Sequence, residues 1–332
     1  DALPICQSNG EIALFPWNTS RRPGRVMHAL LLLFPVLERK QAPLHAISLM
    51  INTRRCCIVT KKVNVAIVQR SGAGTTDENL REMSRLVEEA VKSFPHLDVI
   101  VFPEYCYFAP TTMEESKKVA EEIPGFFTDA MASLAKKHNV NIIPGTFIEN
   151  APSGKVHNAT VFIDRKGKIL ATYRKIHLMD AIGYKESEYV EAGTEMCVFD
   201  SDIGRIGMMV CYDLRFPELA RSMVLKGADI LFVPSEFPSG NPLPPRTDHW
   251  DLLVRSTALF NLTYVVASNQ YGPLHKDNPF GRSSIVDPWG TIIAAASGRE
   301  DIVYAALDMD YQQQVRDRVA TWVNRRPEVY EL

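Results

Sequence analysis

From about Val63 onward, short runs of apolar residues alternate with longer segments in which apolar residues recur at helical spacing. The runs predict buried strands, whereas the spacing predicts helices with one apolar face. In the first of these helices, residues 75–94, Thr76 or Asp77 is expected to cap the N-terminus. The strands predicted in this half are "VNVAIVQ", "DVIVFPE", "NIIPGTF", "NATVFID" and "KILATYRK", and the helices are "TTDENLREMSRLVEEAVKSF" and "FFTDAMASLAKKHNV".

A similar order recurs in the second half of the chain. The strands "GRIGMMVC", "ADILFVP" and "TYVVASN" alternate with the helices "PELARSMVLKG" and "HWDLLVRSTALFNL", and the turn "DPWG" joins "SSIVD" to "GTIIAAA" as a hairpin. The C-terminal stretch "VRDRVATWVNRRPEVYEL" predicts a helix and a tail. Two α/β halves followed by strand pairs predict an α/β fold of two packed β-sheets flanked by helices, an αββα sandwich.

Residues 1–61 differ from the rest, with tandem basic residues, the adjacent Cys56 and Cys57, and no sustained period of either kind. Because the sequence also begins with Asp1, we expect an atypical N-terminal extension that is poorly ordered, a targeting segment or not native to the mature protein, followed by one folded domain over 62–332. The apolar run Ala29–Leu37 is shorter than the roughly 20 residues that span a bilayer. No small-residue cleavage site follows it, so a secretion signal is not expected either.

Composition narrows the functional classes. The 332 residues carry a formal net charge of -2, so neither nucleic acid nor an anionic membrane is expected as a partner. The six cysteines are scattered without a CxxC pair, which disfavours a zinc cluster and a disulfide framework and favours a reducing, cytoplasmic location. No glycine-rich phosphate-binding loop follows a predicted strand.

Three predicted strands end at reactive side chains: Glu104, Lys175 and Cys211. Each alone has an ordinary structural explanation, but strands of parallel type present their carboxyl ends to one crevice. A cysteine thiol, with a pKa of about 8.5, needs a nearby base to become a nucleophile. No histidine is placed for that role, whereas a buried Glu104 with a raised pKa is suited to it. Lys175 can stabilise a thiolate and an oxyanion.

The motifs around these residues are "FPE", "YRKIH" and "CYDLRFPE", followed by "PSEF" and "DPWG". In this order and spacing they resemble the Glu, Lys and Cys signatures of the nitrilase (carbon–nitrogen hydrolase) superfamily, from about Val63 to the C-terminus. The resemblance implies a carbon–nitrogen hydrolase domain over 62–332 with a nitrilase-like αββα subunit. It also implies a homodimer or higher homo-oligomer, and no metal or organic cofactor.

The same resemblance implies a mechanism. Glu104 is the general base, Cys211 attacks the carbon of a small-molecule amide, and Lys175 with the backbone N–H of Tyr212 holds the oxyanion. Ammonia leaves, a thioester forms, and water then releases a carboxylate. A second family glutamate matches Glu186, which orients Lys175 and the substrate, although its neighbour Glu188 is a rival for the position.

Residues close to these motifs have structural or pocket-lining roles. Tyr105, Glu236 and Phe237 lie just beyond strand ends and are expected to line the pocket. Cys106 is expected in the core. Because Arg215 stands between two carboxylates in "CYDLRFPE", we expect it to brace the turn after the cysteine through an ion pair with Asp213 or Glu218.

Three related activities differ in how well they fit the sequence motifs. "YRKIHLMD" and "CYDLRFPE" resemble the branch of ω-amidases and deaminated-glutathione amidases, which remove ammonia from a primary amide on a carboxylate-bearing molecule. "GYKESEYVEAGTE" is instead similar to N-carbamoyl (ureido) amidohydrolases, which release carbon dioxide and ammonia. Nitrile hydrolysis fits less well because Tyr212 stands where those enzymes commonly have Trp. An inactive scaffold of the same fold is disfavoured because Glu104, Lys175 and Cys211 are all present.

Overall fold

The computed structural model of the chain describes residues 61–238, 246–274 and 278–330, which belong to one compact unit. The extension predicted for 1–61 lies outside the described residues apart from Lys61, and so does the apolar run Ala29–Leu37. Within the described ranges, no helix combines the length and the apolar character needed to cross a membrane.

The first β-sheet is built around parallel strands with antiparallel strands on both sides. The central strands β1, β2 and β3 run parallel, while β13 pairs antiparallel with β1, and β5 pairs antiparallel with β3, β4 and β6. The strand order is β13-β1-β2-β3-β5-β4, with β6 also on β5. The strands are β1 (Lys62–Gln69), β2 (Val99–Val101), β3 (Asn141–Ile143), β4 (Phe147–Asn150), β5 (Val156–Ile163), β6 (Ile169–Arg174) and β13 (Asp301–Asp308).

The second β-sheet has the order β12-β11-β10-β9-β8-β7. Its strands β8, β9 and β10 run parallel, and the predicted hairpin of β11 and β12 closes one edge in antiparallel pairing. The strands are β7 (Cys197–Ser201), β8 (Gly204–Met208), β9 (Ile230–Ser235), β10 (Tyr264–Asn269), β11 (Ser284–Val286) and β12 (Ile292–Ala295).

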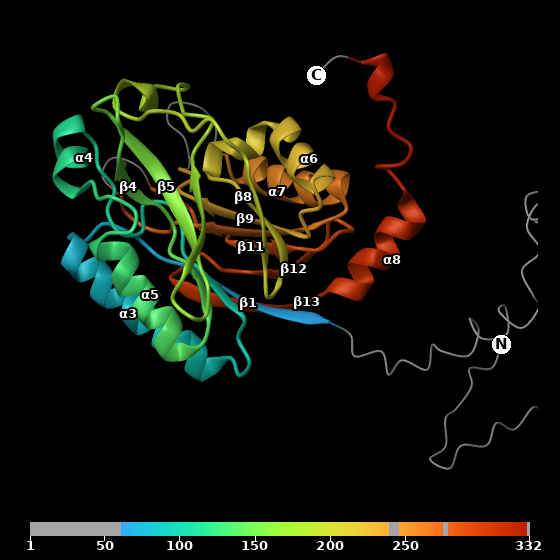
Figure 1. Ribbon diagram of the computed structural model, residues 1–332, viewed down its shortest axis with the longest axis horizontal. Coiled ribbons are helices and arrows are strands. Elements are labelled where there is room, and N and C mark those ends of the chain that lie inside the picture. The colour runs from blue at the N-terminus through green and yellow to red at the C-terminus, as the bar shows by residue number, and fades with distance from the viewer. Residues whose placement is uncertain (1–60, 239–245, 275–277, 331–332) are drawn as a thin grey trace, which may run out of the picture. The chain divides into compact units, whose positions relative to one another are not determined.

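Helices cover the outer face of each sheet. Alternation along β1 shows the layering, because Val63, Val65 and Ile67 pack into the core shared with the second sheet, whereas Ala66 and Val68 pack with residues of α3 and α5. Helices α6 and α7 lie on the second sheet (Figure 1). The predicted αββα sandwich is therefore confirmed. The helices are α3 (Thr76–Ser93), α4 (Met113–Val119), α5 (Phe126–His138), α6 (Pro217–Leu225), α7 (Thr247–Asn261) and α8 (Met309–Val319).

Some boundaries differ from those predicted. Thr75, not Thr76 or Asp77, caps α3, because its side chain and that of Glu78 form a reciprocal capping box. The predicted strand "NIIPGTF" is two strands, β3 and β4, separated at Gly145, where φ is +75° and a side chain would meet the carbonyl oxygen of Pro103. Strands β7 and β13 and helix α4 were not predicted.

Candidate active site

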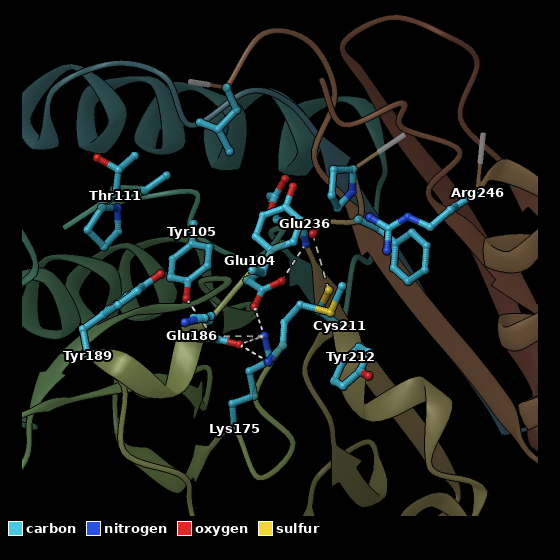
Figure 2. A pocket seen from close by; sticks show the side chains of 18 residues that line it. Glu104, Tyr105, Thr111, Lys175, Glu186, Tyr189, Cys211, Tyr212, Glu236 and Arg246 are labelled. Carbon is cyan, nitrogen blue, oxygen red and sulfur yellow. Dashed lines mark hydrogen bonds and ion pairs between the residues drawn. The ribbon is translucent and has the colours of Figure 1, made fainter. Parts of the chain in front are cut away.

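Glu104, Lys175, Glu186 and Cys211 line one pocket of about 470 Å³ (Figure 2). Glu104 follows the parallel strand β2 by a few residues, and Cys211 follows the parallel strand β8 in the same way. Their meeting is expected, because parallel strands present their carboxyl ends to a shared crevice. Lys175 directly follows β6, which pairs antiparallel with β5, so parallel pairing does not explain its place in the pocket. The three predicted strand ends thus meet, although one of them arrives from an antiparallel ribbon.

A buried ion cluster lies at the base of this pocket. Lys175 Nζ is 3.0 Å from Glu104 Oε1 and 2.9 Å from Glu186 Oε2. The exposed fractions of the three side chains are 3%, 1% and 6% respectively, so water screens these charges little. The side chain of Glu188, the rival glutamate, is 67% exposed and pairs with Lys185 outside the cluster.

Hydrogen bonds fix both carboxylates of the cluster. Asn158 Nδ2 donates to Glu104 Oε1 at 2.8 Å and to Glu186 Oε1 at 3.3 Å, and the Tyr105 hydroxyl donates to Glu186 Oε1 at 3.0 Å. The backbone N–H of Glu236 donates to Glu104 Oε2 at 2.7 Å. Sequence reasoning missed Asn158, although a buried polar residue opening the apolar strand "NATVFID" was a usable signal.

Burial and mutual charge set the protonation of the site. Burial raises the pKa of Glu104; the ammonium of Lys175 opposes this rise and the charge of Glu186 adds to it. Burial alone disfavours the ammonium of Lys175, but Glu104 and Glu186 hold its pKa well above the usual value. Burial, reinforced by Glu104, raises the pKa of the Cys211 thiol well above its usual value. The resting site therefore holds a charged lysine and a protonated thiol at neutral pH.

The cysteine stands at a sharp backbone turn. Cys211 is the first residue of the short helix η2 (Cys211–Arg215) and has a φ of +46°, a left-handed conformation that is uncommon outside glycine. Its thiol donates to the carbonyl oxygen of Glu236 at 3.4 Å. The backbone N–H of Tyr212 lies at the start of this helix, where N–H groups lack helical partners. Tyr105, beside Glu104, is also left-handed at φ +55°. Such strain is common at functional sites.

Buried Asp213 ties the cysteine turn to the strand that carries the lysine. Its Oδ2 accepts hydrogen bonds from the Tyr173 hydroxyl at 2.6 Å and from the N–H of Val210 at 2.8 Å. Its Oδ1 lies 2.7 Å from His177 Nδ1 and accepts from the N–H of the same residue at 3.0 Å. Asp213 therefore fixes Lys175 and Cys211 relative to one another from both sides.

The predicted brace by Arg215 is wrong. Among the described residues, no ion pair joins it to Asp213 or Glu218, because Asp213 is turned toward β6 instead. The Arg215 guanidinium lies 5.5 Å from the centre of the Phe237 ring, and its Nη2 lies 3.5 Å from His249 Nδ1.

The predicted lining residues Tyr105, Glu236 and Phe237 all reach the pocket, and so does Tyr212, whose backbone N–H was expected to hold the oxyanion. Cys106 is fully buried away from the pocket, in the core around α3 and α5. In the described ranges, no three His, Cys, Asp or Glu side chains are placed to hold a metal ion. Sequence reasoning missed the other lining residues, which are Ala109, Pro110, Thr111, Met179, Tyr184, Lys185, Tyr189, Pro238, Arg246 and Leu274.

We predict that Lys175→Met lowers the free energy of unfolding at pH 7 by about 3–5 kcal/mol, because two buried carboxylates lose their cation. Without Lys175 the pKa of Glu104 rises further above its unfolded value. A carboxyl group whose pKa is raised in the folded state makes the protein less stable as the pH rises through that folded pKa. The loss of unfolding free energy in the variant, relative to the wild type, should therefore be larger at pH 8 than at pH 5.

Urea unfolding at both pH values measures this effect. Lys118→Met is the matched control, because the Lys118 side chain is 68% exposed and its ion pair with Glu114 should contribute less than about 1 kcal/mol. Equal stability losses for the two variants would contradict the buried-cluster account.

Comparisons with known proteins identify the family of the chain. Residues 64–317 match the family model described as carbon–nitrogen hydrolase. Omega-amidase NIT3 of Saccharomyces cerevisiae is 34% identical over 286 residues, which cover 82% of this chain and 96% of that protein. Deaminated glutathione amidase of Bos taurus is 32% identical over 277 residues, covering 80% of this chain and 83% of that protein.

Solved structures share the fold. The crystal structure of Saccharomyces cerevisiae Nit3, described as a member of branch 10 of the nitrilase superfamily, has a TM-score of 0.70 at 32% identity and covers 80% of this chain and 96% of its own. A carbon–nitrogen hydrolase from Helicobacter pylori has a TM-score of 0.76 at 26% identity, covering 82% and 97%. The chain belongs to the carbon–nitrogen hydrolase family, and it is an amidohydrolase with the nitrilase fold that its three motifs predicted.

Proposed function

We propose that this protein hydrolyses a small primary amide to a carboxylate and ammonia through a thioester on Cys211. The observation that supports this most is the buried ammonium of Lys175 between Glu104 and Glu186, in the same pocket as the thiol. Relatives named omega-amidase and deaminated glutathione amidase favour a primary amide over the ureido alternative.

In the acylation half, Glu104 takes the proton of the Cys211 thiol as sulfur attacks the amide carbon. The carbonyl oxygen gains negative charge, which the ammonium of Lys175 and the backbone N–H of Tyr212 stabilise. Glu104 then gives its proton to the leaving nitrogen, the carbon–nitrogen bond breaks, and ammonia departs. The raised pKa of Glu104 suits a group that both accepts and donates this proton.

The deacylation half repeats these steps with water. Glu104 takes a proton from a water molecule, whose oxygen attacks the thioester carbon. The carbon–sulfur bond breaks, the proton returns to sulfur, and the carboxylic acid leaves. The net reaction is amide plus water to acid plus ammonia, with the site unchanged. Glu186 acts as a positioning residue, because it holds Lys175 through both of its carboxylate oxygens, at 3.2 and 2.9 Å.

We predict that Cys211→Ala abolishes ammonia release from glutaramate, because no other group can form the acyl intermediate. Glu104→Gln should retain a slow first half and lack the base for the second, so intact mass should show an acyl adduct and peptide mapping should place it on Cys211. An adduct on Cys106, or full turnover by the Cys211→Ala protein, would overturn the mechanism. A native circular dichroism spectrum is the folding control for both variants.

The acidic side of the pH profile provides a separate prediction. Glu104 must be ionised to accept the thiol proton, so kcat/KM should fall as the pH drops through its raised pKa. The charge of Glu186 contributes to that rise, so Glu186→Gln should move the acidic limb to lower pH while lowering kcat roughly 100-fold through misplaced Lys175. Glu188→Gln is the control, and an acidic limb that moves to higher pH in the Glu186 variant would contradict the assignment.

We infer that two copies of this chain pair through the outer face of α7. Leu252, Leu259 and Phe260 of this helix are 68%, 44% and 58% exposed, whereas its inner face is buried on the second sheet. Large exposed apolar patches commonly mark contact surfaces, and a twofold axis would place the same patch on both copies. The described cysteines Cys106, Cys197 and Cys211 are free, which supports a cytoplasmic location.

Sedimentation should therefore give twice the mass of the chain, and Leu252→Glu with Phe260→Glu should give the monomer mass. Phe126→Glu is the matched control, since Phe126 is 65% exposed on α5, over the other sheet. A native protein that sediments as a monomer, or as an unchanged dimer after the α7 changes, would contradict this interface.

A further inference from the structure

Glu186, the residue that holds Lys175, stands in a loop that folds back on itself. It is the first residue of the short helix η1 (Glu186–Glu188). The N–H of Met179, seven positions earlier, donates to Glu186 Oε2 at 2.7 Å, and the N–H of Glu186 donates to the carbonyl oxygen of Met179 at 3.4 Å. The two ends of the segment 179–186 therefore meet, and the position of the carboxylate depends on how firmly this loop is closed.

The tip of the loop is strained and forms part of the pocket wall. Ile182 has a φ of +49° and Gly183 a φ of +89°, so two consecutive residues are left-handed. A β-branched residue such as Ile182 is rare in this conformation, and strained backbone persists only where the surrounding structure holds it. Tyr184 and Lys185, which follow directly, line the pocket. The loop therefore needs restraints outside its strained tip to stay closed.

Two charged side chains supply such restraints at Ser187, the residue directly after Glu186. Asp180 Oδ1 accepts a hydrogen bond from the N–H of Ser187 at 3.0 Å. Hydrogen bonds from the side chain and the N–H of Ser187 lower the pKa of Asp180, so its carboxylate is charged at neutral pH. Lys155 Nζ donates to the carbonyl oxygen of Ser187 at 2.7 Å. An anion and a cation thus hold both backbone polar groups of Ser187, and we call Asp180, Ser187 and Lys155 the Ser187 clamp.

The Ser187 clamp also ties the loop to the strand that carries Asn158. Lys155 directly precedes β5, and the N–H of Val156 donates to the carbonyl oxygen of Tyr189, just after η1, at 3.2 Å. Asn158, further along β5, donates to Glu186 Oε1 at 3.3 Å. The backbone beside Glu186 and its carboxylate are therefore both held from the same strand.

The residues of the clamp lie outside the pocket. Asp180 is exposed, and none of Asp180, Ser187 and Lys155 belongs to the lining that surrounds Cys211. Glu186, in contrast, reaches Lys175 at the base of the pocket (Figure 2). A change at Asp180 therefore removes no group from the pocket and can reach the site only through the loop.

We propose that Asp180 is a positioning residue for the reaction, which acts through Ser187 to keep Glu186 in contact with Lys175. Lys155 completes the clamp from the other side. Displacement of Glu186 also moves the ammonium that is proposed to stabilise the oxyanion, and a misplacement of about 1 Å can lower a rate by about 100-fold. This inference rests on the proposed amidase function and adds to it a residue that never contacts the substrate.

The first test is kinetic. Asp180→Ala should lower kcat for ammonia release from glutaramate roughly 5- to 20-fold, as expected for the loss of one or two hydrogen bonds, and should leave KM within about twofold. The loss is smaller than that expected for Glu186→Gln because Glu186 keeps its buried hydrogen bonds. Asp180→Asn retains an oxygen that can accept from Ser187 and should recover most of the lost rate. Lys155→Met removes the other half of the clamp from a different element and should lower kcat in the same way, which keeps the proposal testable if Asp180→Ala does not fold.

A double variant separates positioning from a general loss of stability. If Asp180 acts through Glu186, adding Asp180→Ala to Glu186→Gln should leave kcat at the value of Glu186→Gln alone. Asp164→Ala is the matched control, because Asp164 Oδ1 accepts from the N–H groups of Lys166 and Lys168 at 2.9 and 2.8 Å in the turn between β5 and β6. It should keep the wild-type kcat. Losses that multiply in the double variant, or equal losses for Asp180→Ala and Asp164→Ala, would overturn the proposal.

A crystal structure of the Asp180→Ala protein gives a readout that needs no turnover. It should show the 2.9 Å contact between Lys175 Nζ and Glu186 Oε2 lengthened, or the Glu186 carboxylate in more than one position. Failure of the wild-type protein to release ammonia from any primary amide would count against the proposed function and leave this structural test in force. An unchanged contact in the variant would overturn the role of Asp180, whatever the activity of the protein.

Discussion

The site depends on one ammonium group buried between two carboxylates. Lys175 has almost no contact with solvent, and neither do Glu104 and Glu186. Ions taken out of water need strong mutual contacts and additional hydrogen bonds to compensate for lost hydration. The amide of Asn158 and the hydroxyl of Tyr105 supply those bonds, so the cluster is held in one geometry. The same rigidity keeps the ammonium of Lys175 in a fixed position, as the proposed stabilisation of an oxyanion requires.

A second constraint connects this cluster to Cys211, the proposed nucleophile. Asp213 accepts hydrogen bonds from the Tyr173 and His177 region beside Lys175, and from the backbone just before Cys211. One buried carboxylate thus joins the ends of strands from two different sheets. The left-handed backbone of Cys211 is held within this frame, which explains how a residue in an uncommon conformation can have a fixed place. The carboxylates therefore have two separate roles. Glu104 and Glu186 balance the charge of Lys175, whereas Asp213 fixes the position of Cys211 relative to Lys175.

Much of this arrangement was predictable because it depends on local patterns in the sequence. Apolar runs and helical spacing gave the layers, and Glu104, Lys175 and Cys211 stand at the ends of such runs within characteristic motifs. What local pattern cannot supply is the contact between distant segments. Asn158 reaches Glu104 across 54 positions, and nothing in the chain near Arg246 indicates that it faces the cysteine pocket.

The errors have the same cause. The predicted partner of Arg215 was Asp213 or Glu218, both close to it in sequence. Asp213 instead accepts hydrogen bonds from Tyr173 and His177 at the buried end of β6. Strand β13 was missed because much of it is half-buried at the sheet edge, where the apolar pattern is weak, yet it pairs with β1 along the full length of both strands. Long-range pairing and competition for buried hydrogen bonds therefore mark the limit of what the sequence alone predicts.

The most direct test of this account is a crystal structure of the Cys211→Ala protein with glutaramate bound. The account predicts that the amide carbon lies over the position left by the sulfur, with its oxygen within hydrogen-bond distance of Lys175 Nζ and the N–H of Tyr212. Glu104 should face the amide nitrogen. An amide bound in the pocket with its oxygen directed away from Lys175 would contradict the central claim.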